Sequence, residues 1–285
     1  LEGLCKEYKD FLSNGKTERE CVAQSIELAE KAGYQSMEIS IDATDERLRR
    51  LAWTKEETES VRRTAESCNM KILTMCLSGH KRFPLGSTNP EIVQTGLKVT
   101  QRAIELAGRL GTRVIQIPAF DVYETETRTE ETQKRYVDNL YKVARMAEHA
   151  CVTMAIEPVE ENLLAVKDTM EVVRQIDSWC MQIYPDVANI KSLGIDPIEE
   201  LPYGKGHIAA VHMRDSLPQI YDATLLFGTG QLDFEGVFEK LDELEFTGPL
   251  IVEMWNTDRP EYMEYISQAR EYMEEHIRKV RGEHV

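Results

Sequence analysis

Hydrophobic and polar residues follow a repeating pattern along the chain. The stretches IELAEKAGYQSMEIS, from Ile26, and IELAGRLGTRVIQIP, from Ile104, each space their apolar residues as a helix does, up to a glycine. Gly33 and Gly111 stand where a left-handed residue commonly ends a helix, and a short apolar run typical of a buried strand follows each. A looser copy, VFEKLDELEFTGPLIVEMW, has Gly248 at the same point. The pattern predicts helix–strand units repeated along the chain.

Eight apolar runs qualify as strands, with helical patterns between them. The predicted strands are Leu1–Cys5 (the weakest), Met37–Ile41, Ile72–Leu77, Val114–Ile117, Thr153–Ile156, Gln182–Tyr184, Ile208–Val211 and Leu250–Val252. The predicted helices are Glu18–Ala32, Thr54–Cys68, Ile92–Leu110, Glu131–His149, Lys167–Asp177, Phe234–Leu244 and an amphipathic segment at 260–280.

Strands that alternate with helices indicate an α/β fold with a parallel sheet. Eight such strands in about 250 residues match a closed (β/α)8 barrel, so we expect one barrel domain over residues 1–285. An open doubly wound sheet is the alternative. It would usually carry a glycine-rich phosphate turn after an early strand, and neither GxGxxG nor GxxxxGK[ST] occurs in the sequence.

The composition is that of an ordinary globular protein with an excess of acid. The 285 residues are 42% hydrophobic and 29% charged, and the formal net charge is −16. Such a charge repels phosphate backbones and anionic lipid, so we expect neither nucleic acid nor a membrane as the main partner. No apolar run reaches membrane length and no signal-peptide pattern opens the chain, which favours the cytoplasm. The six cysteines show no CxxC pair and are expected to be reduced.

Four side chains of the kinds that bind metals follow four successive predicted strands. Taken singly, an acid at a strand end is more often a salt-bridge or cap residue, and a lone histidine is more often a hydrogen-bonded core residue. The carboxyl ends of barrel strands meet at one face, however, and several buried carboxylates at one place require a nearby cation. Three oxygen ligands and one nitrogen suit Mn²⁺, Mg²⁺, Co²⁺ or Zn²⁺. The four residues are Glu157 in MAIEP, Asp186 in QIYPD, His212 in AAVHMRD and Glu253 in LIVEMW.

The positions of Glu157 and Glu253 indicate proton-transfer chemistry. Their strands are three apart in an eight-membered ring, so the two carboxylates would approach the centre from well-separated directions. A metal bound to two adjacent oxygens of a hydroxyketone acidifies the C–H between them by stabilising the enediolate. One carboxylate could remove that proton and the other return it to the opposite face, which inverts a stereocentre. Both transfers on one face would instead isomerise an aldose and a ketose, so both reactions stay open at this point.

Longer stretches carry a family resemblance over nearly the whole chain. The chain resembles the xylose-isomerase-like barrel superfamily and, within it, the L-ribulose-5-phosphate 3-epimerases (L-xylulose-5-phosphate 3-epimerases) of bacterial L-ascorbate and L-xylulose catabolism. The family opens with a strand of the type Leu-Gly-x-Tyr-Glu-Lys, whereas this chain has LEGLCKEY, and we assign no substrate contact there. The stretches that carry the resemblance are EISIDATDERLRRLAW (38–53), MCLSGHKRFPLGS (75–87), RVIQIPAFDVY (113–123), QIYPDVAN (182–189), GHIAAVHMRD (206–215), FGTGQLDF (227–234) and GPLIVEMW (248–255).

The resemblance implies a metal-dependent 3-epimerase that interconverts L-ribulose 5-phosphate and L-xylulose 5-phosphate through a metal-stabilised enediolate. It implies Glu157, Asp186, His212 and Glu253 as metal ligands, Glu157 and Glu253 as the acid/base pair, and a homodimer. One alternative is an isomerase or epimerase of another ketose or hexulose 6-phosphate. A second is a metal-dependent abasic-site endonuclease, whose multi-metal site is rich in histidine. A third is a barrel that only binds a ligand.

The substrate phosphate needs cationic or amide donors. CLSGHKRFPLGS, after the third predicted strand, brings basic side chains to the catalytic face, although a charged run is usually a solvated loop. FGTG (227–230) could add backbone N–H donors or be only a turn. Glu38 could bond a sugar hydroxyl or have a structural partner, and Arg214 could polarise a substrate oxygen or pair with Asp215. The predicted substrate contacts are Ser78, His80, Arg82, Glu38, Asn189 and Arg214.

Overall fold

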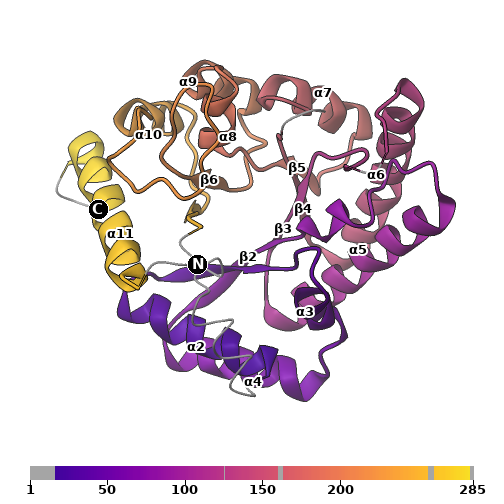
Figure 1. Ribbon diagram of the computed structural model, residues 1–285, viewed down its shortest axis with the longest axis horizontal. Helices are drawn as coiled ribbons and strands as arrows, with labels where there is room; N and C mark the ends of the chain where they lie inside the picture. Colours follow the sequence, from indigo (N-terminus) through magenta and orange to yellow (C-terminus); the bar gives the residue numbers. More distant parts are fainter. Residues whose placement is uncertain (1–16, 125, 160–162, 256–259, 283–285) are drawn as a thin grey trace.

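Seven parallel strands lie at the centre of the described part of the molecule, and helices form a ring outside them (Figure 1). The structure is a computed structural model that describes residues 17–124, 126–159, 163–255 and 260–282. The strands are β1 (Ser36–Ser40), β2 (Lys71–Cys76), β3 (Val114–Pro118), β4 (Thr153–Glu157), β5 (Met181–Ile183), β6 (Val211–Met213) and β7 (Leu250–Val252).

The strands pair in chain order. One sheet has the order β1-β2-β3-β4-β5, and β6 pairs with β7 in a second sheet. Two isolated parallel bridges, Ile183 with Ile208 and Asp186 with His212, connect these sheets. In-order parallel pairing with helical connections is the topology of the predicted (β/α)8 barrel.

Helices cover the outside of the strands. Short 3-10 helices occur at η1 (Arg49–Ala52), η2 (Ser78–Lys81) and η3 (Leu201–Gly204). The α-helices are α2 (Glu18–Lys31), α3 (Asp45–Leu48), α4 (Lys55–Ser67), α5 (Pro90–Leu110), α6 (Glu130–Ala150), α7 (Val166–Ile176), α8 (Val187–Ser192), α9 (Pro197–Glu200), α10 (Phe234–Glu243) and α11 (Tyr262–Arg281).

Local sequence signals explain several helix ends. Thr17 begins α2 with a capping box, because its side chain accepts from the backbone of Glu20 while the Glu20 carboxylate accepts from the Thr17 N–H. Gly33 and Gly111 have φ values of 86° and 79°, so both predicted left-handed terminators are confirmed. The prediction for Gly248 is wrong: Glu245, with φ of 58°, follows α10 instead.

Two predicted strands need comment. The predicted strand Leu1–Cys5 lies outside the described residues. The predicted strand Ile208–Val211 is displaced toward the C-terminus, because the ladder with β7 runs from Val211–Leu250 to Met213–Val252. Ile208 forms only an isolated bridge to β5. His212 therefore lies within β6 rather than after it.

The core is split by the strands. The larger apolar cluster joins the outer faces of β1 to β5 to the helices packed on them. A small cluster takes side chains from strands of both sheets or from residues next to them, so these residues pack across the space that the strands enclose. Its buried members are Val114, Ala155, Tyr184, Ala210 and Ile251. This packed layer supports the catalytic face above it.

Candidate active site

Four side chains meet at the carboxyl ends of β4 to β7. Glu157 is the last residue of β4, and Glu253 directly follows β7. Asp186 is the N-cap of α8, just after β5, and His212 lies in β6. Each of the four offers one ligand atom, and these atoms all lie within 4.8 Å of one another. The sequence prediction that four strand ends bring these residues together is therefore supported by the geometry.

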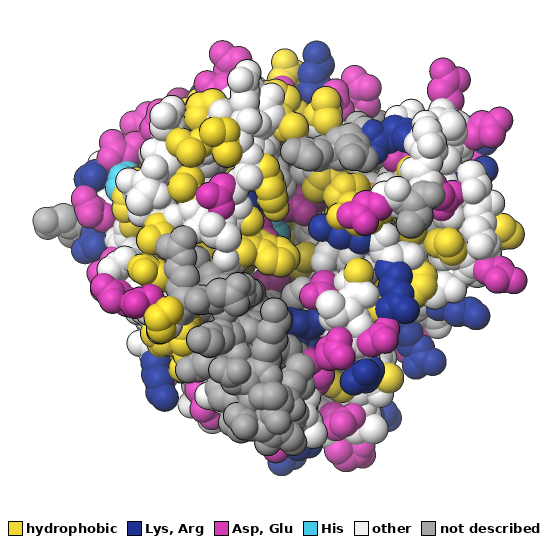
Figure 2. Space-filling model, in the orientation of Figure 1, with side chains coloured by type: hydrophobic (Ala, Val, Ile, Leu, Met, Phe, Trp, Pro, Cys, Tyr) yellow, Lys and Arg dark blue, Asp and Glu magenta, His cyan; other side chains and the backbone are white. Residues whose placement is uncertain are grey.

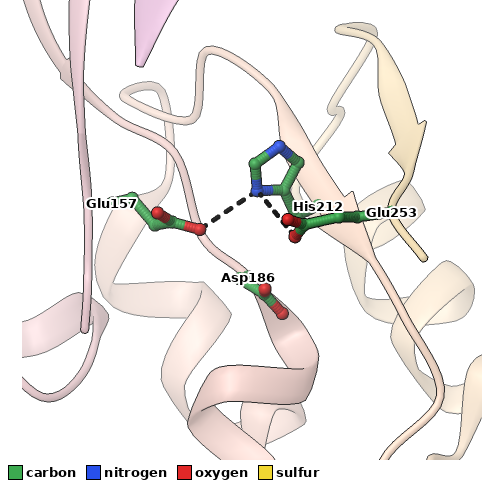
Figure 3. Close-up of side chains that lie close together, drawn as sticks. All are labelled: Glu157, Asp186, His212 and Glu253. Carbon is green, nitrogen blue, oxygen red and sulfur yellow. Dashed lines mark hydrogen bonds and ion pairs between the residues drawn. The ribbon is translucent and has the colours of Figure 1, made fainter. Parts of the chain in front are cut away.

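His212 lies between the two glutamates. Its Nδ1 is 3.0 Å from Oε1 of Glu157 and 3.6 Å from Oε2 of Glu253. Figure 3 shows Glu157 and Glu253 approaching this nitrogen from opposite sides, with Asp186 beneath. The opposed approach is the arrangement expected for two carboxylates that act on opposite faces of one small molecule.

Other side chains hold these carboxylates in place. Asp186 is fully buried; its Oδ1 accepts from the backbone N–H groups of Ala188 and Asn189. Its Oδ2 accepts from Arg214, at 2.8 Å from Nη2 and 3.2 Å from Nε. The Gln116 side-chain amide, from β3, donates to Oε2 of Glu157. The carboxylates of Asp186 and Glu157 are thus held in defined orientations.

The environment moves the pKa values of these groups in different directions. Burial raises the pKa of Glu157 to about 7. Burial also opposes charge on Glu253, but the neighbouring His212 and Arg214 hold its pKa below the ordinary value. For His212, burial favours the neutral ring, yet Glu38 and Glu253 raise its pKa well above the usual value. Because these carboxylates repel one another when ionised, a bound cation would stabilise their charged forms.

The donor set fits a divalent cation. Its three carboxylates and one imidazole are the ligands that Mn²⁺, Mg²⁺, Co²⁺ and Zn²⁺ accept. All but Glu253 are buried, and the Glu253 side chain is 28% exposed. The positive charge of the protein balances only part of the negative charge of these carboxylates, since Arg214 already pairs with Asp186. The residues could therefore hold a metal ion with one side open to the solvent.

A cavity of about 320 Å³ opens over these four residues. Figure 2 shows the molecular face hollowed near its centre, with acidic and hydrophobic side chains at the edge. The cavity is large enough for a phosphorylated pentose, and its walls combine apolar rings with polar groups. The residues that line it are Cys76, Ser78, Lys81, Pro118, Phe120, Tyr123, Glu124, Glu157, Val159, Asp186, Asn189, His212, Arg214, Tyr221, Glu253 and Trp255.

The loop after β2 places its residues on different sides. Residues three apart in a 3-10 helix lie one above the other, so Ser78 and Lys81 of η2 both face the cavity. His80 points toward α5 instead: it is buried, its Nε2 lies 2.9 Å from Oγ1 of Thr100, and burial lowers its pKa to about 4.

Arg82 is similarly directed away from the cavity. It is exposed and donates to Asp45 and to the carbonyl of Ala43. Neither His80 nor Arg82 is a cavity-lining residue. Of the basic residues in this loop, the cavity wall includes Lys81.

The other predicted substrate contacts have mixed outcomes. Asn189 and Arg214 line the cavity, and Arg214 donates to the Asn189 side chain as well as to Asp186. Glu38 does not line this cavity, and both of its carboxylate oxygens bond protein groups.

Backbone amides of the loop FGTG (227–230) already have acceptors within the protein. The N–H groups of Gly228 and Gly230 donate to Oδ2 of buried Asp215, at 2.9 and 2.8 Å. Of the two readings left open for these amides, the geometry favours the structural one, since they hold the loop between β6 and α10. Asp215 thus has loop amides as its partners rather than Arg214.

The sequence matches the family described as xylose isomerase-like TIM barrel over residues 26–279. The chain belongs to this family. It is 34% identical over 261 residues to L-ribulose-5-phosphate 3-epimerase UlaE of Escherichia coli strain SMS-3-5, and the match covers 91% of each chain. The family membership confirms the predicted barrel and the predicted relationship to the 3-epimerases.

Solved structures of this fold agree. D-psicose 3-epimerase from Clostridium cellulolyticum H10 superposes with a TM-score of 0.75 at 14% identity, covering 90% of this chain and 93% of the other. A structure of L-ribulose 3-epimerase gives 0.75 at 18% identity, covering 92% and 90%. These two neighbours show the shared fold, and together with the UlaE match the comparisons indicate an epimerase of the isomerase class.

Sequence reasoning missed some residues that line the cavity or support its acids in this family member. Lys81 was one letter within a basic run, and only the 3-10 turn distinguishes it from its neighbours. Gln116 lies in the apolar strand β3 and gave no signal. The exposed rings of Tyr221 and Trp255 also border the cavity. Among the described residues, none of the helices combines the length and apolar character that a membrane span requires.

Proposed function

We propose that the protein is a divalent-metal-dependent 3-epimerase that interconverts L-ribulose 5-phosphate and L-xylulose 5-phosphate. The observation that carries the proposal is the opposed placement of Glu157 and Glu253 on either side of His212 Nδ1, within a set of ligands that could hold a cation. The substrate assignment is supported by the relative of 34% identity, whose name is L-ribulose-5-phosphate 3-epimerase.

In this proposal Glu157, Asp186, His212 and Glu253 hold the metal ion. A bound divalent cation would supply the positive charge that stabilises the enediolate oxygens of the substrate. The donor set accommodates Mn²⁺, Mg²⁺, Co²⁺ or Zn²⁺. Backbone amides and Arg214 fix the orientation of the Asp186 carboxylate within this set.

Glu157 and Glu253 move the proton. In one direction one of them takes the proton from C3, and the other delivers a proton to the opposite face of the planar intermediate. The Gln116 amide holds one oxygen of Glu157, and Trp255 Nε1 donates to Oε1 of Glu253 at 3.1 Å. These contacts fix the carboxylates so that each faces only one side of the substrate.

Lys81 binds the phosphate in this proposal. Its Nζ lies 5.5 Å from the ring centres of both Phe120 and Tyr123, which line the cavity with it. Among the residues that the structure describes, no carboxylate forms an ion pair with Lys81, whereas Arg214 is held by Asp186. Lys81 is therefore the cation of the cavity wall whose charge is available to an anionic ligand.

The test follows the proton at C3. Enzyme loaded with Mn²⁺ is incubated with L-ribulose 5-phosphate in deuterated water, and the carbon that acquires deuterium is identified by NMR. We expect L-xylulose 5-phosphate with deuterium at C3. Deuterium at C1 would show an aldose–ketose isomerase and would refute the epimerase assignment.

Matched variants test the two-carboxylate scheme. Glu157→Gln and Glu253→Gln should each lower turnover by at least about a hundredfold, since general acid–base catalysis contributes that much or more. Glu171→Gln, on the exposed side of α7, is the control and should keep full activity. Normal turnover by either site variant would contradict the scheme.

A further inference from the structure

The second ring nitrogen of His212 has a partner of its own. While Nδ1 faces Glu157 and Glu253, Nε2 lies 2.9 Å from Oε1 of Glu38, a residue of β1. The other carboxylate oxygen of Glu38 accepts from the Tyr184 hydroxyl at 2.9 Å. The rings of Tyr184 and His212 also contact each other, with centres 4.5 Å apart. The imidazole is thus fixed on its Nε2 side by two residues, Glu38 in β1 and Tyr184 directly after β5.

This contact decides which nitrogen can bind a metal. A neutral imidazole carries its hydrogen on one nitrogen and a lone pair on the other. A carboxylate can only accept a hydrogen bond, so the contact with Glu38 keeps a hydrogen on Nε2. When a metal ion displaces the hydrogen that Nδ1 shares with Glu157, the lone pair of the neutral ring is then on Nδ1. Nδ1 is the nitrogen that faces the other three members of the proposed metal set.

We propose that Glu38 is a positioning residue that holds His212 in the tautomer and ring orientation required for metal binding, and that Tyr184 orients Glu38. The inference rests on the metal site of the proposed function. Glu38 acts through His212 and touches neither substrate nor metal. Carboxylates in this position commonly orient metal-binding histidines and raise their basicity.

The geometry does not favour a direct substrate contact by Glu38. Its side chain is 11% exposed, and it borders two smaller cavities, of about 90 and 210 Å³, rather than the 320 Å³ cavity. Both of its oxygens are engaged by His212 and Tyr184. A sugar hydroxyl would have to share an oxygen that already accepts from His212 or Tyr184.

Metal affinity tests the inference without relying on activity. The wild-type protein and its variants are titrated with Mn²⁺ against a competing chelator. Glu38→Ala should weaken Mn²⁺ binding by about 10- to 100-fold. Glu38→Gln should have an intermediate effect, since its amide oxygen still accepts the N–H of His212. Tyr184→Phe should weaken binding less than Glu38→Ala does, because the carboxylate remains but loses its orienting hydrogen bond.

Controls separate positioning from general damage to the fold. Tyr34→Phe removes a comparable hydroxyl contact, to the carbonyl of Ile266 at 3.0 Å, at a place outside the site and should leave Mn²⁺ affinity unchanged. Glu38→Gln and Tyr184→Phe keep the side-chain volume, so they carry the test if Glu38→Ala does not fold.

The tautomer can be observed directly. In Zn²⁺-loaded protein with ¹⁵N-labelled histidine, the His212 signal, assigned with a His212→Asn variant, should show the hydrogen on Nε2. Glu38→Ala should abolish the slow solvent exchange of that hydrogen.

Two failures are distinguishable. If the wild-type protein binds no Mn²⁺ or Zn²⁺, the proposed function fails and this inference with it. If the wild-type protein binds metal and the Glu38 and Tyr184 variants bind it equally well, only the role of Glu38 is refuted.

Discussion

Replacing Arg214 with methionine should destabilise the metal-free protein far more than the metal-loaded protein. Arg214 donates twice to Asp186, at 2.8 and 3.2 Å, and its Nε lies 3.6 Å from Glu253. With Arg214 removed, His212 remains the cation in contact with the acids of the proposed metal set among the residues that the structure describes. Methionine preserves much of the side-chain length but removes the charge.

The magnitude follows from burial. Removing one partner of a buried ion pair costs about 3–5 kcal/mol, because the other charge is left uncompensated. The full range applies here, since the Arg214 side chain is 5% exposed and that of Asp186 is fully buried. With Mn²⁺ bound, the charge of the ion replaces that of Arg214, and the remaining loss is chiefly the hydrogen bond to Asn189, about 1 kcal/mol. The two conditions should therefore differ by about 2–4 kcal/mol.

Urea unfolding followed by circular dichroism measures this difference. Wild type and Arg214→Met are compared in EDTA and in saturating Mn²⁺. By linkage, the extra stabilisation of the variant by Mn²⁺ must appear as tighter Mn²⁺ binding in a direct titration. Arg50→Met is the matched control: Arg50 is fully buried and pairs with Glu18 at 2.9 Å, away from the site. Its cost should be the same with and without metal.

An equal cost for Arg214→Met in EDTA and in Mn²⁺ would refute the reasoning. It would mean that a bound ion does not replace Arg214 in balancing the negative charge of the acids near His212. A cost below about 1 kcal/mol in EDTA would contradict the claim that Arg214 balances a buried charge.

Two further predictions concern substrate and pH. Lys81→Gln should raise KM for L-ribulose 5-phosphate by roughly 10- to 100-fold with little change in kcat, since a hydrogen bond to a charged group contributes about 1.5–3 kcal/mol. Steady-state kinetics with unphosphorylated L-ribulose, the control, should show no such change. An equal loss on both sugars would exclude a phosphate contact. Because the pKa of Glu157 is raised to about 7 and that of His212 well above its usual value, the folded metal-free protein holds extra protons in the range from about pH 5 upward. Its stability in EDTA should therefore fall as pH rises from 6 to 8. The stabilisation by Mn²⁺ should grow over the same range, because Mn²⁺ binding displaces those protons. Denaturant titrations at several pH values measure both, and a stabilisation by Mn²⁺ that did not change with pH would contradict this prediction.

The parts of the site that could be predicted from the sequence are those that depend on topology alone. Once the alternation of strands and helices indicates a barrel, any side chain at a carboxyl strand end must face the same opening. Glu157, Asp186 and Glu253 follow this rule directly. His212 follows it too, although its strand is placed three residues too early in the prediction.

The missing parts depend on local rotation and long-range contact. Whether His80 or Lys81 faces the cavity depends on one 3-10 turn, which a run of mixed basic and polar residues does not reveal. The bond between Glu38 and His212 joins residues 174 positions apart, and it requires the curvature that brings β1 opposite β6. The FGTG loop appeared free for phosphate because its acceptor, Asp215, is 13 to 15 residues away.

The bridge between Asp186 and His212 has one more consequence. These two residues sit at the seam where the five-stranded and two-stranded sheets meet, and the His212 N–H donates to the carbonyl of Pro185 at 2.9 Å. Asp186 and His212 therefore serve both the proposed chemistry and the joining of the two sheets. Glu157 instead pairs within the five-stranded sheet, and Glu253 follows the last strand of the two-stranded sheet. A descendant of this enzyme could abandon its reaction by exchanging either glutamate and still keep its shape. Changing the aspartate would also remove the N-cap of α8, and changing the histidine would break the link to Glu38 of β1.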